Sequence, residues 1–253
     1  MILRRIISHV RTQNWVAVLL DFLIVVAGVF IGIQVSNAND AQGDRAFERE
    51  LLVELRSDLD VDFGEFERAI LVNNRRIAAV QYTIENAGDT EISIPNVVSP
   101  STRRDDSSIQ EVENPVDEAI RNRLWSTSLI AYFAKPSASS LEALLASGDF
   151  NRVSDKELLS LLQAYRQKLE ALDTTQQTIF IDMRNNAAAI GLKYGLTPFD
   201  IVPEETFLEL VGENKELLAA LRAQAGLSSA HNQLVEAAQT AAYDLAAYLD
   251  GQE

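Results

Sequence analysis

The amino-acid sequence predicts an all-α protein, in which one N-terminal transmembrane helix precedes a domain folded as an antiparallel helical bundle. Residues 15–35 are apolar over a length that can cross a bilayer. After residue 48, apolar residues recur at steps of three and four, which is the period of a helix. No repeat of fixed length is present, so a solenoid is disfavoured and a bundle is the economical way to bury these faces.

The apolar run WVAVLLDFLIVVAGVFIGIQV holds 21 residues and one charge, Asp21. At about 1.5 Å per residue it spans roughly 30 Å, the thickness of the hydrocarbon core of a membrane. A buried helix of a soluble protein is rarely so long and so apolar on every side. A cleaved signal peptide is a second alternative, because Ser36-Asn37-Ala38 resembles a cleavage site. The apolar part of a signal peptide is shorter, however, and we expect an uncleaved anchor.

The charges around this run predict its orientation. Three arginines and no acid precede it within the first thirteen residues, whereas Asp40 and Asp44 come before the next basic residue, Arg45. The positive-inside rule therefore places residues 1–14 in the cytoplasm and everything after Val35 on the far side. The spacing of apolar residues in MILRRIISHVRT predicts that residues 1–14 form a short, basic, amphipathic head on the inner leaflet.

One face of the membrane helix differs from the others, because it carries Asn14, Asp21, Gly28 and Gly32. At about 100° per residue, the two glycines lie about 20° to either side of Asp21. Gly28 and Gly32 form a GxxxG pair, which lets two helices approach closely, and an unpaired acid inside a bilayer costs a few kcal/mol. We expect this face to contact another transmembrane helix, either in a second copy or in a different protein. In the alternative interpretation, the glycines are ordinary transmembrane residues with no role in helix contact, and the side chain of Asp21 extends to the inner membrane–water interface.

The domain after the membrane helix is predicted to start with a helix over residues 48–88, after a short break near 37–43. Residues 88–114 contain two prolines and are expected to form a long surface loop with a possible binding role. Asn114-Pro115 then makes a helix start that should lead to Lys135-Pro136. A short helix, SSLEALLASG, should stop at Gly148.

Residues 158–190 form the most regular segment. Ser154 and Glu157 make a capping box before it, and Gly191 and Gly195 close it. A heptad pattern connects positions 158, 162, 165, 169, 172, 176, 179, 183, 186 and 190, with polar residues only at Gln176 and Asn186 among its later members. A further helix is expected from Pro203 through Leu221, broken near Gly212 and stopped by Gly226. The last helix should begin at Ser228 or Ser229 and reach Leu249.

The composition excludes several kinds of chemistry. The 253 residues include no cysteine, which rules out thiolate metal sites, cysteine nucleophiles and disulfides. They include only two histidines. A net charge of −15 repels phosphate backbones, so we expect no binding of nucleic acid. We find no phosphate-binding loop and no nucleophile elbow, and the sequence therefore predicts no catalytic residue, no cofactor and no metal.

Three groups of residues were considered as sites. The run Asp58-x-Asp60-x-Asp62-x-Gly64 is similar to a calcium loop, but the glycine falls at position seven rather than six and Ala69 stands where a glutamate belongs. We expect these acids to form a solvated face. His231 has no ligand pattern around it and is expected to be a satisfied or solvated residue in the first turn of a helix. Trp125, with Tyr132 and Phe133, is assigned to the core.

Two stretches resemble an uncharacterised family of single-pass bacterial membrane proteins, found mainly in Gram-negative bacteria. The first is residues 1–40, and the second, AYFAKPSASSLEALLASGDFNRVSDKELLSLLQAYRQ, is residues 131–167; together they cover about a third of the chain. The family has a basic head, then Asp-Phe, a Gly-Val-Phe-Ile-Gly-like run and Gln-Val-x-Asn-Trp-Asn-Asp/Glu. The matching positions here are Asp21, Phe22, Gly28 to Gly32, Gln34, Val35, Asn37, Asn39 and Asp40. Ala38 departs from the pattern, since it replaces the tryptophan that would anchor the outer interface.

This resemblance implies an inner-membrane protein with a helical periplasmic domain, and it implies no activity. The sequence therefore favours a non-enzymatic, membrane-anchored scaffold that acts by association in the lipid bilayer, as a homo-oligomer or with another transmembrane helix. A periplasmic ligand-binding or sensing module that signals through a partner is the alternative. A membrane-tethered hydrolase that uses paired carboxylates is the third possibility.

Overall fold

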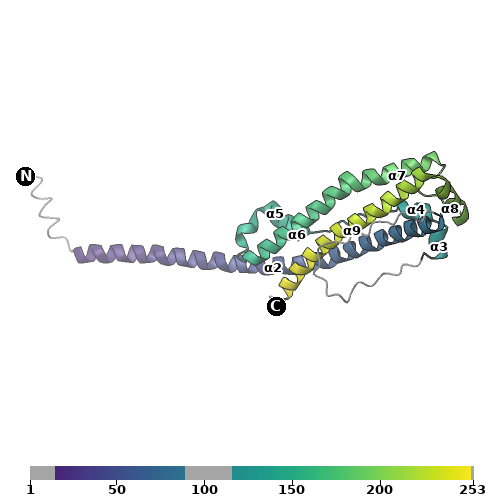
Figure 1. Ribbon diagram of the computed structural model, residues 1–253. Helices are drawn as coiled ribbons and strands as arrows, with labels where there is room; N and C mark the ends of the chain where they lie inside the picture. Colours follow the sequence, from purple (N-terminus) through teal and green to yellow (C-terminus); the bar gives the residue numbers. More distant parts are fainter. Residues whose placement is uncertain (1–14, 89–115, 252–253) are drawn as a thin grey trace, which may run out of the picture. The chain divides into compact units, whose positions relative to one another are not determined.

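The computed structural model describes residues 15–88 and 116–251, and the side chains of the first segment from residue 18 onward. Within these ranges every regular element is a helix and no strand is present, so the predicted all-α class is confirmed (Figure 1). The chain divides into two compact units, Met1–Leu51 and Leu52–Glu253. We refer to the second as the helical unit. The predicted basic head of residues 1–14 and nearly all of the predicted loop of residues 88–114 lie outside the described residues.

The first described helix, α2, runs from Trp15 to Asn86 without interruption. The break expected near residues 37–43 is therefore absent. That segment contains one glycine, Gly43, and a single glycine costs a helix only about 1 kcal/mol, too little to end one. The predicted stop is confirmed, because the chain leaves the helix after Asn86 and Gly88 takes a left-handed conformation with φ of 88°.

Two short helices, α3 (Glu118–Arg121) and α4 (Leu124–Leu129), replace the single long helix predicted after Asn114-Pro115. Helix α3 ends at Asn122, whose backbone N–H and side-chain amide both donate to the carbonyl of Glu118, each at 3.2 Å. The cap of α3 is Asp117, whose carboxylate accepts from the amide of Ile120 at 2.8 Å. Asn114 and Pro115 lie outside the described residues.

Helix α5 (Ser139–Ser147) ends at Gly148, which has a φ of 74°, and this confirms the prediction. A 3₁₀ turn, η1, follows over Asp149–Arg152. Helix α6 (Lys156–Thr175) is capped by Asp155 rather than by Ser154. The Asp155 carboxylate accepts from the amides of the second and third helical residues, at 2.9 and 3.1 Å. Asp155 lies one residue closer to the helix, where its oxygen reaches these amides.

The chain continues from α6 through a π-helical turn, η2 (Gln176–Phe180), into α7 (Ile181–Lys193). The predicted heptad is correct up to Gln176, which is buried. Beyond it the prediction is wrong, because a π-turn accommodates one extra residue and rotates everything after it. The buried positions are then Phe180, Ala187 and Gly191, each one residue after a predicted member, namely 179, 186 and 190.

Helix α8 (Glu204–Glu213) begins after Pro203 as predicted, and the break predicted near Gly212 falls at Asn214. The last helix, α9 (Lys215–Asp250), passes through Gly226 without interruption. The stop predicted there and the new start at Ser228 or Ser229 are therefore wrong. Residues on both sides of Gly226 are buried, and this packing outweighs the glycine's low helix propensity.

Contacts along the whole length of α9 organise the helical unit. Near the start of α6, Asp155 accepts a hydrogen bond from Tyr248, close to the end of α9. At the other end, Lys193 in the last turn of α7 forms an ion pair with Glu216 in the first turn of α9. Figure 1 shows α6 and α7 lying beside α9 over this distance.

The buried faces of two helices follow alternating steps of four and three residues. In the helical unit, α2 buries Leu55, Leu59, Asp62, Phe66, Ala69, Asn73, Arg76 and Val80. Helix α9 buries Leu217, Leu221, Gln224, Ser228, His231, Val235, Ala238, Ala242, Leu245 and Leu249. This is the heptad spacing of helices that pack side by side. Polar residues stand near the middle of each series.

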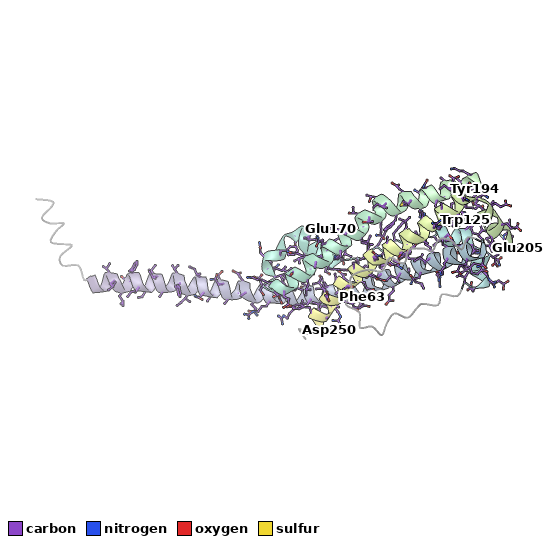
Figure 2. The ribbon with its side chains drawn as sticks, in the orientation of Figure 1. Phe63, Trp125, Glu170, Tyr194, Glu205 and Asp250 are labelled. Carbon is purple, nitrogen blue, oxygen red and sulfur yellow. The ribbon has the colours of Figure 1, made fainter. Side chains whose placement is uncertain are left out.

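The core at the far end of α7 is built around Trp125. The indole is buried against Phe207 of α8, with ring centroids 6.3 Å apart, and its N–H donates to the carbonyl of Thr197 at 2.9 Å. Figure 2 shows Trp125 inside this end of the unit. The assignment of Trp125 to the core is confirmed, whereas Tyr132 and Phe133 are only half-buried.

Candidate functional site

The N-terminal part of α2 is the one segment of the described residues that is long and apolar enough to cross a membrane. None of its most apolar stretch is buried in the protein, whereas the core helix of a soluble protein would be mostly buried. Between Val18 and Val35 the large apolar side chains all point into open surroundings. The alternative of an ordinary core helix therefore does not fit this segment.

The predicted face of this helix lies open. Asp21, Gly28 and Gly32 are all exposed, and a Cβ atom built on either glycine would meet no other atom within 4 Å. Asn14, the fourth predicted member, lies outside the described residues. Small residues beside a polar one on an exposed apolar helix provide a surface on which a second helix can pack closely.

A second polar cluster lies in the helical unit, and we call it the central polar layer. Its centre is His231, a buried residue of α9 that faces α2 and η2. The prediction that His231 lies in the first turn of a helix is wrong, because α9 begins at Lys215. Asn73 donates through Nδ2 to His231 Nδ1 at 2.9 Å, so the other ring nitrogen carries the proton and donates to Gln176 Oε1 at 3.0 Å. Phe133 and Phe180 pack on the imidazole, with centroids 5.9 and 5.0 Å away.

This environment favours the neutral form of the imidazole. Burial lowers the pKa of His231 to about 4, and the nearby Arg76 guanidinium lowers the pKa in the same direction. Both ring nitrogens are already hydrogen-bonded within the protein. His231 is therefore satisfied, as one of the two readings of the sequence predicted.

The same layer holds an arginine without an acidic partner. Arg76 is buried, donates from Nη2 to Gln224 Oε1 at 2.6 Å and from Nε to the carbonyl of Ser128 at 3.3 Å, and forms no ion pair with a described carboxylate. Burial lowers its pKa to about 10. Gln224 in turn donates to the carbonyl of Met183 at 3.1 Å. One charge and several amides thus connect α2, α4, α7 and α9.

Apolar positions alone do not predict this layer, because its members are polar. Asn73 and Arg76 continue the four-and-three series of α2, and Gln224, Ser228 and His231 continue that of α9. The signal was present in the sequence, because the spacing holds through the polar positions without a shift. Reading a heptad by position rather than by residue type would have found it.

The acids of the calcium-like run have a structural role. Asp62 is fully buried, where it accepts from the hydroxyl of Tyr165 at 2.6 Å and from the amide of Ser137 at 2.5 Å. Asp58 accepts from the amide of Ser140 at 2.7 Å and from the Ser139 hydroxyl at 2.8 Å. The expected solvated face is therefore wrong for Asp62.

These two carboxylates fix residues 137–140, in which Ala138 takes a left-handed φ of 41°. Burial raises the pKa of Asp62, while its hydrogen bonds oppose that shift. Because both carboxylates are occupied by hydrogen bonds that hold the start of α5, they anchor the backbone rather than form a reaction centre. Among the residues that the structure describes, no group of acids and histidines is arranged to hold a metal ion.

In comparisons with known proteins, no family model, no curated protein and no solved structure matches this chain.

Proposed function

We propose that this chain is a single-pass membrane protein of the bacterial inner membrane that acts by association rather than by catalysis. Residues 15–35 cross the bilayer, residues 1–14 lie in the cytoplasm, and the helical unit is a periplasmic antiparallel bundle. The face of Asn14, Asp21, Gly28 and Gly32 packs against another transmembrane helix. The resemblance of the first 40 residues to the bacterial membrane family agrees with this proposal.

One observation carries the proposal. The most apolar stretch of the protein is a regular helix with no buried residue in it, and Asp21, Gly28 and Gly32 share one of its faces. Exposing so many aliphatic side chains to water costs about 25 cal/mol per Å² of apolar surface, so this segment needs a different medium. Inside a bilayer the exposed carboxyl of Asp21 is the expensive group, and a helix partner that hydrogen-bonds to it removes that cost.

The bundle is supported by the contacts of α9. Its last turns contact the start of α6, its first turn contacts the end of α7, and His231 in its middle contacts Gln176 between those helices. Helices α6–α7 and α9 therefore run in opposite directions. Such a rigid unit suits a scaffold that presents a constant surface.

The test is the mass of the full-length protein in a mild detergent. If the wild type is a defined oligomer and Gly28→Leu/Gly32→Leu is a monomer, the glycine face is the site of self-association. Ala27→Leu is the control, because it places a leucine side chain about 120° around the helix from Asp21. It should leave the oligomer intact.

A version lacking residues 1–40 separates two further outcomes. Loss of the oligomer in this version, but not in the glycine double variant, would assign self-association to another part of those residues. A monomer in every sample would refute self-association, and a different partner helix for Asp21 would then be sought by cross-linking from a residue next to Asp21 in native membranes.

A further inference from the structure

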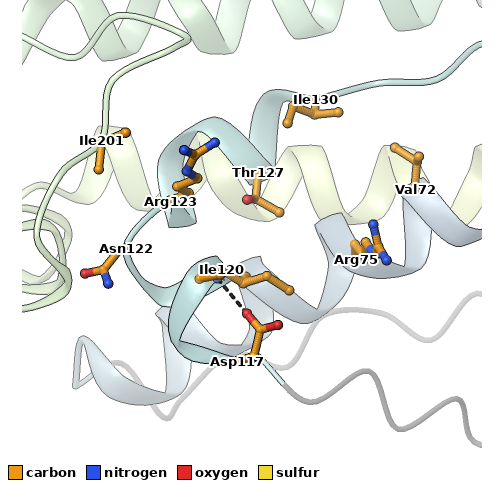
Figure 3. Close-up of a pocket in the computed structure, with 10 residues that line it drawn as sticks. Val72, Arg75, Asp117, Ile120, Asn122, Arg123, Thr127, Ile130 and Ile201 are labelled. Atoms are coloured by element: carbon orange, nitrogen blue, oxygen red, sulfur yellow. Dashed lines mark hydrogen bonds between the residues drawn. The ribbon is translucent and has the colours of Figure 1, made fainter.

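A surface pocket of about 790 Å³ lies in the helical unit between α2, α3, α4 and the segment before α8 (Figure 3). Pockets that hold small organic molecules enclose about 300–1,000 Å³ and combine an apolar lining with a few polar groups. The volume of this pocket falls within that range, and its lining combines apolar and polar side chains. None of its residues belongs to the proposed membrane contact.

The apolar part of the lining comes from three isoleucines on different segments. Ile130 and Ile201 are 54% and 63% exposed, and Ile120 of α3 is half-buried. Ile201 follows a tightly held turn, in which the amide and hydroxyl of Thr197 both donate to the Asp200 carboxylate at 2.6 Å. The apolar surface is therefore preformed and accessible to a ligand.

Two arginines provide the charge. Arg75 of α2 and Arg123 before α4 both line the pocket, and Figure 3 shows them on separate segments of the chain. Neither guanidinium forms an ion pair or a hydrogen bond with another described residue. The chain has 37 acids and 22 bases, and Arg56, Arg121 and Arg166, in contrast, each pair with a carboxylate.

One acid also lines the pocket, but it does not neutralise both cations. Asp117 accepts from the amide of Ile120 at 2.8 Å, so one of its oxygens is occupied as the cap of α3. Two arginines and one aspartate leave a net charge of +1 in the pocket. A ligand with one negative charge matches that charge, whereas a polyanion would be repelled by the acidic remainder of the chain.

We propose that this pocket binds a small amphipathic carboxylate. The carboxylate lies against Arg75 and Arg123, whose planar guanidinium groups match its geometry. The apolar body covers Ile120, Ile130 and Ile201 and removes their surface from water. This binding does not depend on the membrane association proposed above, because none of the pocket residues lies in the N-terminal unit.

The test uses the full-length protein in nanodiscs of zwitterionic phosphatidylcholine. The probe is 4-(4-fluorophenyl)butyrate, followed by ¹⁹F NMR, with empty nanodiscs as the blank. We expect saturable binding to the protein sample. The neutral amide of the same compound has the same ring but no charge, and it should bind about tenfold more weakly, since a charge-assisted hydrogen bond contributes about 1.5–3 kcal/mol.

Two sets of variants identify the site. Arg75→Gln/Arg123→Gln should weaken the binding of the carboxylate about tenfold and leave that of the amide unchanged. Arg166→Gln is the matched control, because it removes an exposed arginine from the distant surface of α6 and should have no effect on either compound. Equal binding of carboxylate and amide, an unchanged affinity in the arginine double variant, or the absence of saturable binding would each overturn the proposal.

Discussion

Helix α2 contains two stretches with the same backbone and opposite surroundings. In Val18–Val35 the ring of Phe30 is 61% exposed, whereas in the helical unit the ring of Phe66 is 0% exposed. The first stretch carries a single charge, Asp21, whereas the second places apolar residues on one seam with charges around it. The amount of apolar surface in a stretch therefore does not by itself predict its burial in the protein. The periodic spacing of charges marks the stretch that packs against other helices.

The largest effect should come from removing a buried ring in the second stretch. Phe66→Ala leaves a cavity in the core and should lower the free energy of unfolding by about 3–5 kcal/mol. Phe30→Ala is the matched change in the first stretch and should alter the free energy of unfolding little. Guanidinium unfolding of the full-length protein in detergent, followed by the fluorescence of buried Trp125, measures both. Similar losses for the two variants would show that the stretches do not differ as described.

The next largest effect concerns the polar layer, which the first stretch lacks. Since the pKa of His231 is about 4 in the folded protein and 6.5 when unfolded, the unfolded chain takes up a proton first as the pH falls. The contribution of His231 to stability is complete above pH 6.5 and declines as the pH falls towards 4. At about 1.4 kcal/mol per pKa unit the loss is about 3 kcal/mol.

Unfolding of the wild type and of His231→Gln across this pH range tests that expectation. Glutamine keeps hydrogen-bonding capacity but does not titrate. The variant should be less stable at neutral pH, and its free energy of unfolding should change less between pH 6.5 and pH 4 than that of the wild type. The same slope in both proteins would assign the acid sensitivity to other groups.

A smaller effect is expected at the contact of Gly191 with Trp125. A Cβ atom on Gly191 would collide with the six-membered ring of the indole. Gly191→Ala should therefore lower the free energy of unfolding by about 1–3 kcal/mol, the usual cost of overpacking a core. A change in the fluorescence maximum of the folded protein would accompany it, because the indole must shift.

The smallest effect has the opposite sign. Gly64 lies within α2, and a Cβ atom there would meet nothing within 4 Å. Gly64→Ala should raise the free energy of unfolding by about 0.5–1 kcal/mol, because alanine loses less backbone freedom in a helix. Thermal unfolding by circular dichroism measures the change. Destabilisation would mean that this face of α2 is covered.

The helix class, the stop at Gly88 and the positions of α5 and α8 were all predictable, because capping and turn signals act over a few residues. The break of α3 at Asn122 was not, since no glycine or proline marks it in the sequence and the Asn122 side chain bonds the same Glu118 carbonyl as the helical backbone bond does. Gly226 misled the prediction for a different reason. Its intrinsic preference is weak beside the burial of Leu221 and Ala225 on the same helix. The charge of the pocket was also hidden, because Arg75 and Arg123 are 48 positions apart in the chain.

The π-turn at Gln176–Phe180 has a consequence for comparing this chain with others. A relative whose corresponding helix is regular throughout would be one residue shorter here, and a gap placed anywhere else in α6–α7 would pair core positions with surface ones. An ungapped alignment would pair the exposed Met183 of this chain with a buried residue of the relative. The partly buried Arg184 is the position that corresponds to that residue. Aligned with the gap at the turn, Gln176 and Phe180 become two fixed columns that identify relatives with the same polar layer.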